Sequence, residues 1–414
     1  VLMTVRFFHT SDWHLGKRLG EFSRLEEQKE VLDEICSISD LEKVQMVLIA
    51  GDLFDSYNPS VEAMELFYQT LKRLSDEGKR AVIAIAGNHD MPERIEAPNP
   101  LAKECGIILS GLPHSIASPF YLSSGLRITD SGPGWVQLKI PQVEVPVNLL
   151  LTPYANEFRM RTYLGSENQD ETLREILSNK WHRNLHEIAN NQSVNILIAH
   201  LYMISNEGEP LEEPLDEEKP ILTPGGASAV FTRQLPLDLH YVALGHLHRR
   251  HTLDGCAFPV VYCGSPLSYS FSEAFQNKSV EIIEALPNLT TKHYSIGLTK
   301  GKRLVRKKFD SPEEAFQWLP HHTDCLLEMT LHTDMYLNAE ITNHFHRLHP
   351  GIVQIIPEFP EESNLKEKEE IAPDPTGEIM ELFKDYFRSI KQVPPDEETL
   401  DIFREIIANE GDNQ

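Results

Sequence analysis

The chain has 414 residues, which is more than one hydrophobic core usually fills, so we expect two or three domains. Its hydrophobic content of 41% is that of an ordinary globular protein, and no stretch reaches the roughly 20 apolar residues of a membrane span. The formal net charge of -25 excludes a chain that is basic throughout. Much of the acidic excess, 17 acidic against 6 basic residues, lies in residues 358–414, so the remaining surface could still face an anionic partner.

The five cysteines are odd in number and form no Cys-x-x-Cys pair, which argues against a disulfide framework and favours a reducing compartment. The apolar segment Val1–Phe8 is too short for the hydrophobic part of a signal peptide and leads into a strand. We therefore expect a soluble, cytoplasmic protein that is not attached to a membrane.

The first ninety residues alternate between runs rich in Val, Ile and Leu, which predict buried strands, and amphipathic runs, which predict helices. In chain order these are a strand at Val5–His9, a helix at about Ser23–Ile38, a strand at Met46–Ala50, a helix at Val61–Leu74 and a strand at Ala81–Ala86. This alternation predicts an α/β fold with a parallel sheet, whose ligand-binding edge lies at the carboxyl ends of the strands.

The helical period disappears from about Ile107 to Leu151, where Pro, Gly and Ser separate short β-prone pieces, so we expect antiparallel strands or hairpins. The stretch Asn206–Ala229, rich in Glu, Pro and Gly, predicts a long exposed loop at the rim of the site. The other predicted elements are a helix at Glu171–Ala189 and strands at Val194–Ala199, Tyr241–Leu244, Phe258–Cys263 and Val280–Ala285.

The pattern changes around residues 297–301, so we assign residues 1–297 to one domain and residues 298–357 to a second, small α+β domain. Residues 358–375 are acidic and punctuated by proline, which is typical of a linker. The predicted elements of the second domain are strands at Leu304–Lys308, Leu326–Leu331 and Val353–Ile356 and helices at Pro312–Trp318 and Met335–Leu348.

Residues 376–414 predict a pair of helices, each with an apolar stripe. Two isolated helices bury little surface, so we expect them to dock either on the body of this chain or on a partner protein. The stripes consist of Ile379, Leu382, Phe383, Tyr386, Phe387 and Ile390 on the first helix and Leu400, Phe403, Ile406 and Ile407 on the second.

Five scattered segments share one feature, because each places Asp, Asn or His just past an apolar run that predicts a strand. They are Asp12-Trp13-His14, Asp52-Leu53-Phe54-Asp55, Gly87-Asn88-His89-Asp90, Ala199-His200 and Gly245-His246-Leu247-His248. A lone Asp or Asn after a strand is most often a turn residue and a lone His is usually structural. The joint occurrence at five strand ends, in a β-α-β order that brings those ends together, favours one shared site.

Residues two apart in an extended segment point the same way, so Asp12 with His14, and His246 with His248, can each hold a metal ion from one strand end. Asp52 is the natural bridging ligand. The mixed carboxylate, imidazole and amide ligands suit Mn²⁺ or similar ions better than a structural zinc site. Two such ions would orient an anionic phosphodiester and activate a water molecule, so we expect a two-metal phosphoesterase.

The remaining polar residues of these segments have distinct expected roles. Asn88 supplies a neutral carbonyl oxygen, which leaves two dications with a net positive charge for the phosphodiester. His89 lies beside a ligand but free of the metals, so it could protonate the leaving oxygen or stabilise the transition state. Asp55 and Asp90 would orient imidazoles by hydrogen bonding.

A basic run follows the first domain and could track a phosphate backbone, although a solvated strand and linker explains it about as well. It comprises Lys300, Lys302, Arg303, Arg306, Lys307 and Lys308.

The motifs together resemble the ordered signature of the calcineurin-like metallophosphoesterases, a β-sandwich flanked by helices. Asp12-x-His14, Gly51-Asp52-Leu53-Phe54-Asp55, Gly87-Asn88-His89-Asp90, His200 and Gly245-His246-x-His248 carry this resemblance. The residues of these motifs are most similar to those of one branch, the SbcD nuclease subunits of bacterial SbcCD complexes, whose archaeal and eukaryotic relatives repair double-strand breaks. Segments specific to that branch are Thr10 to Gly16, Ala50 to Asp55, Tyr241 to His248 and Tyr262 to Pro266, and the resemblance spans essentially the whole chain.

The resemblance implies a ligand set and a catalytic histidine. One Mn²⁺ would take Asp12, His14, Asp52 and His248, and the other Asp52, Asn88, His200 and His246, while His89 matches the family's catalytic histidine. Archaeal and eukaryotic relatives carry a histidine where this chain has Asp55, so a second histidine that contacts the phosphate is not expected here.

The resemblance also implies partners and substrates. Residues 302–357 match a capping domain, and residues 376–408 match a helix pair that binds the coiled coil of the SMC-like ATPase SbcC. The expected activities are a double-strand exonuclease and an ATP-regulated endonuclease on DNA ends and hairpins, in repair and recombination, from a homodimer within a heterotetramer.

Two other functions remain open at this stage. One is a two-metal phosphodiesterase or phosphatase that acts on small molecules or proteins, and the other is a scaffold of the same fold without metals. Protein phosphatases of this fold typically show Asp-Arg-Gly after the second motif and Glu after Asn-His, where this chain has Asp55-Ser56-Tyr57 and Asp90.

Overall fold

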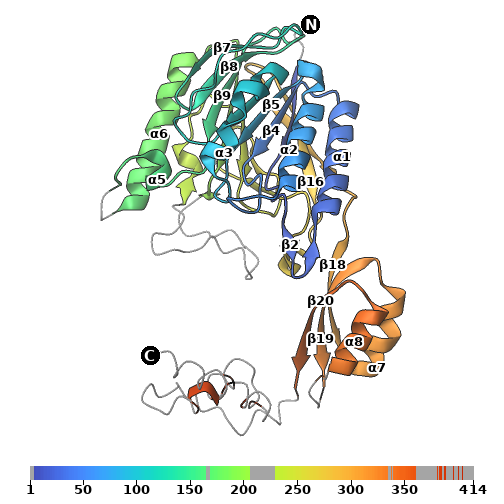
Figure 1. Cartoon of the computed structure of the whole chain (residues 1–414). Coiled ribbons are helices and arrows are strands. Elements are labelled where there is room, and N and C mark those ends of the chain that lie inside the picture. The colour runs from blue at the N-terminus through green and yellow to red at the C-terminus, as the bar shows by residue number, and fades with distance from the viewer. Residues whose placement is uncertain are drawn as a thin grey trace, which may run out of the picture. The chain divides into compact units, whose positions relative to one another are not determined.

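The computed structural model describes residues 4–164, 168–205, 229–333, 337, 339–359, 380, 382–384, 387, 395, 400 and 403. Contacts divide the chain into two units, residues 1–331 with 338–356, and residues 332–337 with 357–414. The larger unit contains two facing β-sheets with helices on their outer sides (Figure 1).

The first sheet has the described strand order β17-β16-β1-β4-β5-β6. Its parallel strands are β1 (Val5–Thr10), β4 (Met46–Ala50), β5 (Ala81–Ile85) and β6 (Ile107–Ser110). At one edge, β16 (Ser279–Ala285) pairs antiparallel with β1, and β17 (Lys292–Gly297) pairs antiparallel with β16. Every residue of β4 is buried, because the strand is covered on both faces. The predicted strands in this half are therefore confirmed.

Helices α1 (Leu25–Leu41) and α2 (Val61–Leu74) cover the outer face of this sheet. Leu32 of α1 and Phe67 of α2 belong to one apolar cluster with Val47 and Ile49 of β4. The Ser60 hydroxyl caps the start of α2 by accepting a hydrogen bond from the Ala63 N–H at 3.2 Å.

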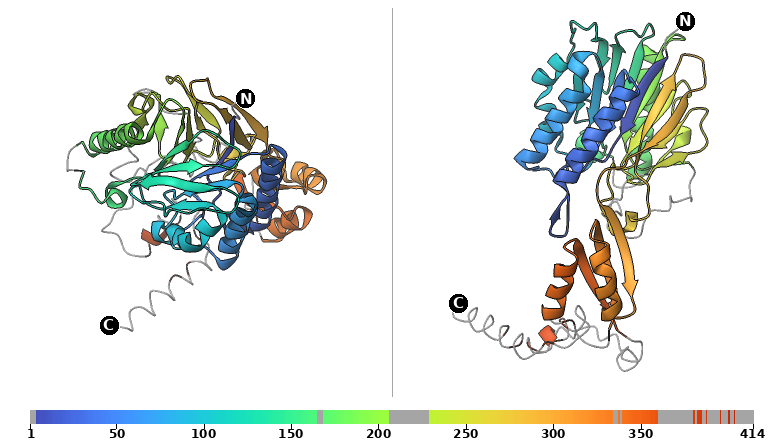
Figure 2. Two further views of the ribbon diagram at one scale, coloured as in Figure 1. Left: turned by 90° about the horizontal axis from the view of Figure 1, so that it is seen from above. Right: turned by 90° about the vertical axis from the view of Figure 1, so that its right-hand side faces the viewer.

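The second sheet has the described order β14-β15-β13-β10-β9-β8-β7. Its outer face is covered by α6 (Gln169–Ile188), whose Trp181 and Leu185 pack with Leu150 and Leu197. Seen from above, α6 lies on the opposite side of the sandwich from α1 and α2 (Figure 2). The strands are β7 (Arg127–Gly132), β8 (Trp135–Lys139), β9 (Val147–Thr152), β10 (Val194–His200), β13 (Tyr241–Gly245), β14 (His251–Leu253) and β15 (Val260–Tyr262).

The inner faces of the two sheets form the main core. Leu48 of β4 and Ile83 of β5 belong to the same cluster as Ile196 of β10 and Ala243 of β13, all without exposed surface. The prediction of an α/β sandwich flanked by helices is confirmed. The core aligns β1, β4, β5, β10 and β13, and this places their carboxyl ends along one edge.

The remaining elements of the larger unit are short. They are β2 (Arg18–Leu19), β3 (Phe22–Ser23), β11 (Met203–Ile204), β12 (Val230–Phe231), α3 (Pro92–Glu96), α4 (Asn99–Ala102), α5 (Glu157–Met160) and the 3₁₀ turns Asp76–Gly78, Lys103–Cys105, Thr232–Gln234, Phe271–Glu273 and Leu319–His321. All five cysteines lie among the described residues and are unpaired. A search of the described helices finds none with the length and hydrophobicity that a membrane crossing requires.

One secondary-structure prediction was wrong in its pairing. Residues 107–151 were expected to form only antiparallel strands or hairpins, but β6 pairs in parallel with β5 and extends the first sheet. The antiparallel meander begins at β7 instead. The predicted loop at residues 206–229 lies outside the described residues except for Ala229.

Residues 303–358 contain a three-stranded sheet, β18 (Arg303–Phe309), β19 (Cys325–His332) and β20 (Ile352–Glu358), with helices α7 (Pro312–Trp318) and α8 (Ala339–Leu348). The predicted small α+β arrangement is therefore present. Leu304 and Leu326 of this sheet share a cluster with Leu19 and Phe271. The domain boundary at residues 297/298 stays a prediction, because the contacts place both parts in one unit.

Five of the predicted stripe residues in the C-terminal segment are described, and some of them contact one another. The rings of Phe383 and Phe403 stack with centroids 3.7 Å apart, and Phe387 lies 5.8 Å from Phe383. Leu400 is 8% exposed. Outside the described residues lie Ile379, Tyr386, Ile390, Ile406 and Ile407.

The two sheets come closest at Gly245, the last residue of β13. A Cβ atom there would lie 1.8 Å from the carbonyl oxygen of Ala50 and 2.9 Å from Nδ1 of His200. We predict that Gly245→Ala lowers the free energy of unfolding by about 3 kcal/mol, because backbone of the facing sheet must move. Urea denaturation measures the loss. Gly297→Ala is the matched control, since a Cβ there meets nothing within 4 Å, and an equal loss in both variants would contradict the prediction.

Candidate metal centre

Loops after β1 and β4 bring the first ligands together. The N–H of Asp12 donates to the carbonyl of Gly51 at 2.9 Å, and that of His14 donates to the carbonyl of Asp52 at 3.0 Å. Both loops leave the extended conformation at once, with φ of 53° at Asp12, 43° at His14 and 47° at Asp52. Left-handed backbone is uncommon for residues other than glycine and concentrates at functional sites.

The first group of convergent side chains is Asp12, His14 and His248. Their ligand atoms lie within 4.8 Å of one another, and the Nε2 atoms of His14 and His248 are 2.9 Å apart. The Asp12 carboxylate is fully buried and accepts hydrogen bonds from the Ser11 hydroxyl and, at 2.9 Å, from the His246 N–H. The strand ends β1 and β13 thus meet, as predicted.

The second group is Asp52, His200 and His246, joined by Asn88. Oδ1 of Asn88 lies 3.0 Å from Nε2 of His200 and 3.1 Å from Nδ1 of His246. Oδ2 of Asp52 lies 3.3 Å from Nε2 of His200 and 3.6 Å from Nε2 of His14. Asp52 therefore lies between the two groups, where a bridging ligand would have to be.

Hydrogen bonds hold two of the imidazoles with Nε2 toward the shared space. Nδ1 of His200 lies 2.8 Å from the carbonyl of Ala50, and a donated N–H there leaves the Nε2 lone pair directed inward. Nδ1 of His248 lies 3.3 Å from the buried carboxylate of Glu273. Such contacts fix the tautomer and orientation of metal-binding histidines.

These donors fit two divalent cations. Carboxylate, imidazole and amide donors converge from both sheets, and burying the Asp12 and Asp52 charges is costly unless cations balance them. The seven predicted ligands fall into two groups that share Asp52, which agrees with the ligand sets implied by the sequence. Their coordination of metal stays a prediction.

The pKa values of the metal-free site differ strongly between its histidines. Burial lowers the pKa of His14 to about 4, and burial together with the neighbouring His200 lowers that of His246 to about 3. Burial alone would also lower the pKa of His200, but the Asp52 carboxylate outweighs it and raises the value to about 9. Burial alone would raise the pKa of Asp52, whereas the His200 imidazole holds it well below its ordinary range.

His89 lies beside this centre and is partly exposed. Its N–H donates to Oδ1 of Asp52 at 2.9 Å, and its Nδ1 lies 3.0 Å from the carbonyl oxygen of Asp55. A ligand atom of His89 also lies within 4.8 Å of those of His14 and Asp52. The geometry permits both a proton-transfer role and metal contact, so the predicted freedom of His89 from the metals stays a prediction.

The two carboxylates expected to orient imidazoles differ. Oδ1 of Asp55 lies 3.7 Å from Nδ1 of His14 and 3.0 Å from Nζ of Lys17. Burial would raise its pKa, but His14 and Lys17 outweigh this and lower it to about 2. Asp90 was assigned wrongly, because its carboxylate accepts the N–H groups of Leu53, Phe54 and Gly87 instead of an imidazole. It links the loops after β4 and β5, whose backbone N–H groups have no strand partner.

Arg159 of α5 is an important residue that the sequence patterns did not single out. The guanidinium is buried, donates to the carbonyls of Gly87 and Asp90 at 2.7 Å, and lies 3.3 Å from the carbonyl of Asn88. It fixes the loop that carries Asn88 and His89. The sequence patterns did not single out Glu273 and Gln28 either. The Gln28 side chain donates to the carbonyl of His14 at 2.7 Å. None of these three follows a predicted strand.

Two glycines of the motifs are required by close approach. A Cβ at Gly51, where φ is 89°, would lie 2.2 Å from Nδ1 of His200. A Cβ at Gly87 would lie 2.0 Å from Oδ1 of Asp52. Any side chain at either position would displace a predicted ligand.

The basic run lies in and just before β18, and two of its side chains contact carboxylates. Arg306 forms an ion pair with Glu328, and Nζ of Lys307 lies 3.5 Å from Glu314 and 4.9 Å from the centroid of the Phe309 ring. Lys300, Lys302 and Arg303 are exposed, as is Lys308.

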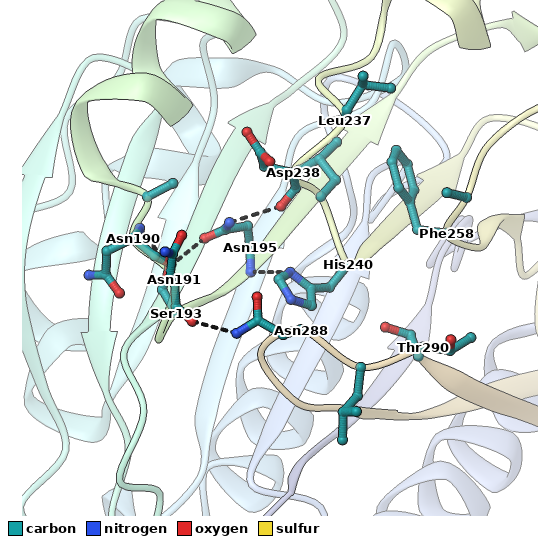
Figure 3. A pocket seen from close by; sticks show the side chains of 15 residues that line it. Asn190, Asn191, Ser193, Asn195, Leu237, Asp238, His240, Phe258, Asn288 and Thr290 are labelled. Carbon is teal, nitrogen blue, oxygen red and sulfur yellow. Dashed lines mark hydrogen bonds between the residues drawn. The ribbon is translucent and has the colours of Figure 1, made fainter.

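A separate cavity of about 330 Å³ lies beside the starts of β10 and β13, at the end of the second sheet opposite to the predicted ligands (Figure 3). Asn195 is one of the residues that line the cavity. The backbone N–H of Asn195 donates to Nδ1 of His240 at 3.1 Å, and its side-chain amide donates to the carbonyl of Asp238 at 2.9 Å. None of the predicted site residues lines it. These hydrogen bonds join neighbouring loops and therefore support the fold.

We predict that Arg159→Met weakens metal binding at the Asn88, His200 and His246 group about tenfold. The variant leaves buried carbonyls unpaired, at a cost of roughly 1–3 kcal/mol each, and frees the Asn88 loop. Calorimetric titration with a divalent metal measures the affinity. The neighbouring Arg161→Met is the control, and equal affinities in the two variants would remove Arg159 from this role.

Metal binding should also release protons. His200, with a pKa of about 9, is protonated at neutral pH and must lose its proton to bind a metal, whereas His14 and His246 are already neutral. The affinity for metal should therefore rise with pH up to about 9. Titration calorimetry in buffers of different ionisation enthalpy should detect release of at least one proton in all, and proton-neutral binding at pH 7 would contradict this assignment.

Comparisons with known proteins agree with this geometry. The family model of calcineurin-like phosphoesterases matches residues 5–250. The SbcD subunit of the SbcCD nuclease of Bacillus subtilis is 34% identical over 411 residues, which cover 98% of each chain. The protein of that name from Staphylococcus epidermidis is 30% identical and covers 68% of this chain and 66% of its own, and that from Rhodobacter capsulatus is 31% identical, with 70% and 68% covered. The chain therefore belongs to the calcineurin-like phosphoesterases, within the group of SbcD nuclease subunits, and is a metal-dependent phosphoesterase.

Proposed function

We propose that the chain is a Mn²⁺-dependent DNA nuclease, a double-strand exonuclease and ATP-regulated endonuclease that acts on DNA ends and hairpins. The observation that carries the proposal is the convergence of seven donor side chains from both sheets, with Asp52 between the two groups. The similarity to proteins named as SbcCD nuclease subunits along nearly the whole chain supports DNA as the substrate. Hard oxygen donors mixed with imidazole favour Mn²⁺ over a thiolate-bound metal.

The ligands are Asp12, His14, Asp52 and His248 for one ion and Asp52, Asn88, His200 and His246 for the other. When bound, the two ions would activate the attacking water and offset the charge of the phosphodiester. Tyr154 packs beside His246, with the ring centroids 6.4 Å apart, and restricts that side of the site.

His89 is proposed as the general acid for the leaving oxygen. Its Nδ1 faces the carbonyl of Asp55, so an N–H there fixes the orientation of the ring and leaves Nε2 as the atom that could transfer a proton. Asp55, which replaces the histidine of archaeal and eukaryotic relatives, contacts His14 and Lys17 instead. We propose that Asp55 positions His14 and does not contact the phosphate.

We also propose the partners that the branch implies. Residues 376–414 would bind an SbcC-type SMC-like ATPase after an acidic linker at residues 358–375, and two copies of this chain would form a homodimer within a heterotetramer. The stacked Phe383 and Phe403 indicate that the two apolar stripes also contact each other. Residues 298–357 would serve as a capping domain, and the complex would act in the cytoplasm.

For DNA contact, the exposed Lys300, Lys302 and Arg303 are better candidates than Arg306 and Lys307, whose charges are partly balanced by Glu328 and Glu314. An ion-paired cation neutralises less phosphate charge and releases fewer counterions.

Cleavage assays with Mn²⁺ separate the proposal from its alternatives. Linear duplex and hairpin DNA, a phosphoprotein, a cyclic nucleotide and a nitrophenyl phosphodiester serve as substrates. Phosphoprotein hydrolysis without DNA cleavage would indicate a phosphatase. A folded chain that binds no metal and cleaves nothing would be a scaffold of the same fold.

We predict that His89→Gln lowers DNA cleavage about 10²- to 10⁴-fold while two metal ions remain bound. The loss should be smaller on a nitrophenyl phosphodiester, because nitrophenolate leaves without protonation. Metal content by elemental analysis and initial rates on both substrates give the comparison. His182→Gln, which changes an exposed histidine on α6, is the control. A lost metal ion would make His89 a ligand, and equal losses on both substrates would exclude the general-acid role.

A further inference from the structure

Two large aromatic side chains are exposed next to the metal centre. Phe158 of α5 is 85% exposed and Tyr163, just after α5, is 74% exposed. Both line a cavity of about 420 Å³ together with Glu93 and Arg161. We call Phe158 and Tyr163 the aromatic rim. Contiguous exposed apolar surface often marks a ligand-binding groove or an interaction site.

The aromatic rim is rigidly connected to the catalytic loop. Phe158 and Arg159 are neighbours in α5, and while Phe158 faces solvent, Arg159 is buried and donates to the carbonyls of Gly87 and Asp90. Asn156 starts this turn by accepting a hydrogen bond from the Arg159 N–H at 2.8 Å. Glu93, which lines the same cavity, belongs to α3 (Pro92–Glu96), directly after the loop that carries Asn88 and His89, so the cavity borders that loop.

We propose that the cavity at the aromatic rim binds an unpaired nucleotide of the strand whose phosphodiester lies at the metal centre. This inference rests on the proposed nuclease function. Aromatic rings bind bases of any sequence by stacking, and a cavity of this size is in the range of small-ligand sites. Inside a duplex both faces of each base are covered, and at a blunt end only the outer face of the terminal pair is open. A base can therefore enter a side-chain cavity in full only when it is unpaired.

Charge in the cavity sets the orientation of the nucleotide. Arg161 is an exposed cation at the end of α5, whereas Glu93 and Glu157 line the same cavity. The phosphates would pass on the Arg161 side, away from the two carboxylates, and the base would turn inward between the rings. Carboxylates can accept hydrogen bonds from base amino groups but repel phosphate. The enzyme should therefore prefer frayed ends, overhangs and hairpin loops to closed blunt ends.

The test uses the full chain with Mn²⁺ and the variants Phe158→Ala, Tyr163→Ala and the double variant. On duplexes with a single-stranded overhang, each single variant should raise KM about tenfold, with a larger rise in the double variant. Phe158→Trp should keep the wild-type KM, because stacking needs an aromatic ring and not a particular residue. Fluorescence of 2-aminopurine in the overhang should be quenched by the wild type and not by the double variant.

Three controls make the outcomes distinct. Tyr121→Ala removes an aromatic ring of similar exposure, 70%, remote from the metal centre, and should change nothing. A nitrophenyl phosphodiester, which has no nucleotide, should be cleaved equally by all variants. A duplex end closed by an interstrand cross-link should show the same KM for wild type and variants.

The results separate this inference from the proposed function. If the wild type cleaves overhang DNA and the aromatic-rim variants have unchanged KM, the inference is wrong and the nuclease function stands. If the variants lose binding to the ATPase partner instead, the rim is a protein-binding surface and the inference is also wrong. A wild type that hydrolyses the nitrophenyl diester but neither binds nor cleaves DNA would overturn the proposed function, and the inference with it.

Discussion

The contact between Asp52 and His200 is the interaction on which the rest of the structure depends. It joins the end of β4 in one sheet to the end of β10 in the other, and both side chains are buried. Two carboxylates, Asp12 and Asp52, are buried just past the strand ends at one edge of this sandwich, and their burial is tolerable only beside cations. Protonated His200 supplies one such charge in the metal-free protein, and two divalent ions would replace it on binding. Stability and metal affinity are therefore coupled at the same atoms.

Close approach of the sheets explains the composition of the motifs. Gly51, Gly87 and Gly245 occur where a side chain would collide with Asp52, His200 or the Ala50 carbonyl. Around them, Asp90 and Arg159 secure the loop that carries Asn88 and His89, and Glu273 orients His248. The positions of the predicted ligands thus result from the strand ends and a few buried hydrogen bonds.

The sequence predicted the strand ends and their ligands because a fully buried parallel strand is a continuous apolar run, as in Met46–Ala50, and the polar residue after it is conspicuous. Family membership, predicted from the same residues, was confirmed. The sequence did not reveal Arg159, Glu273 or Gln28, because they reach the site from helices and turns, where a polar residue gives no sign that it faces the site. It also misassigned β6, since a short run of three apolar residues, Ile107 to Leu109, looks alike in parallel and antiparallel pairing. Asp90 was expected to bind an imidazole, but backbone amides lay closer.

The most direct test of this account is an anomalous diffraction map of the full chain, recorded at the manganese absorption edge after growth of crystals with Mn²⁺. The account predicts two peaks about 3.5–4 Å apart, one among Asp12, His14 and His248 and the other among Asn88, His200 and His246, with Asp52 in contact with both. A single peak, or two peaks that do not share Asp52, would contradict it.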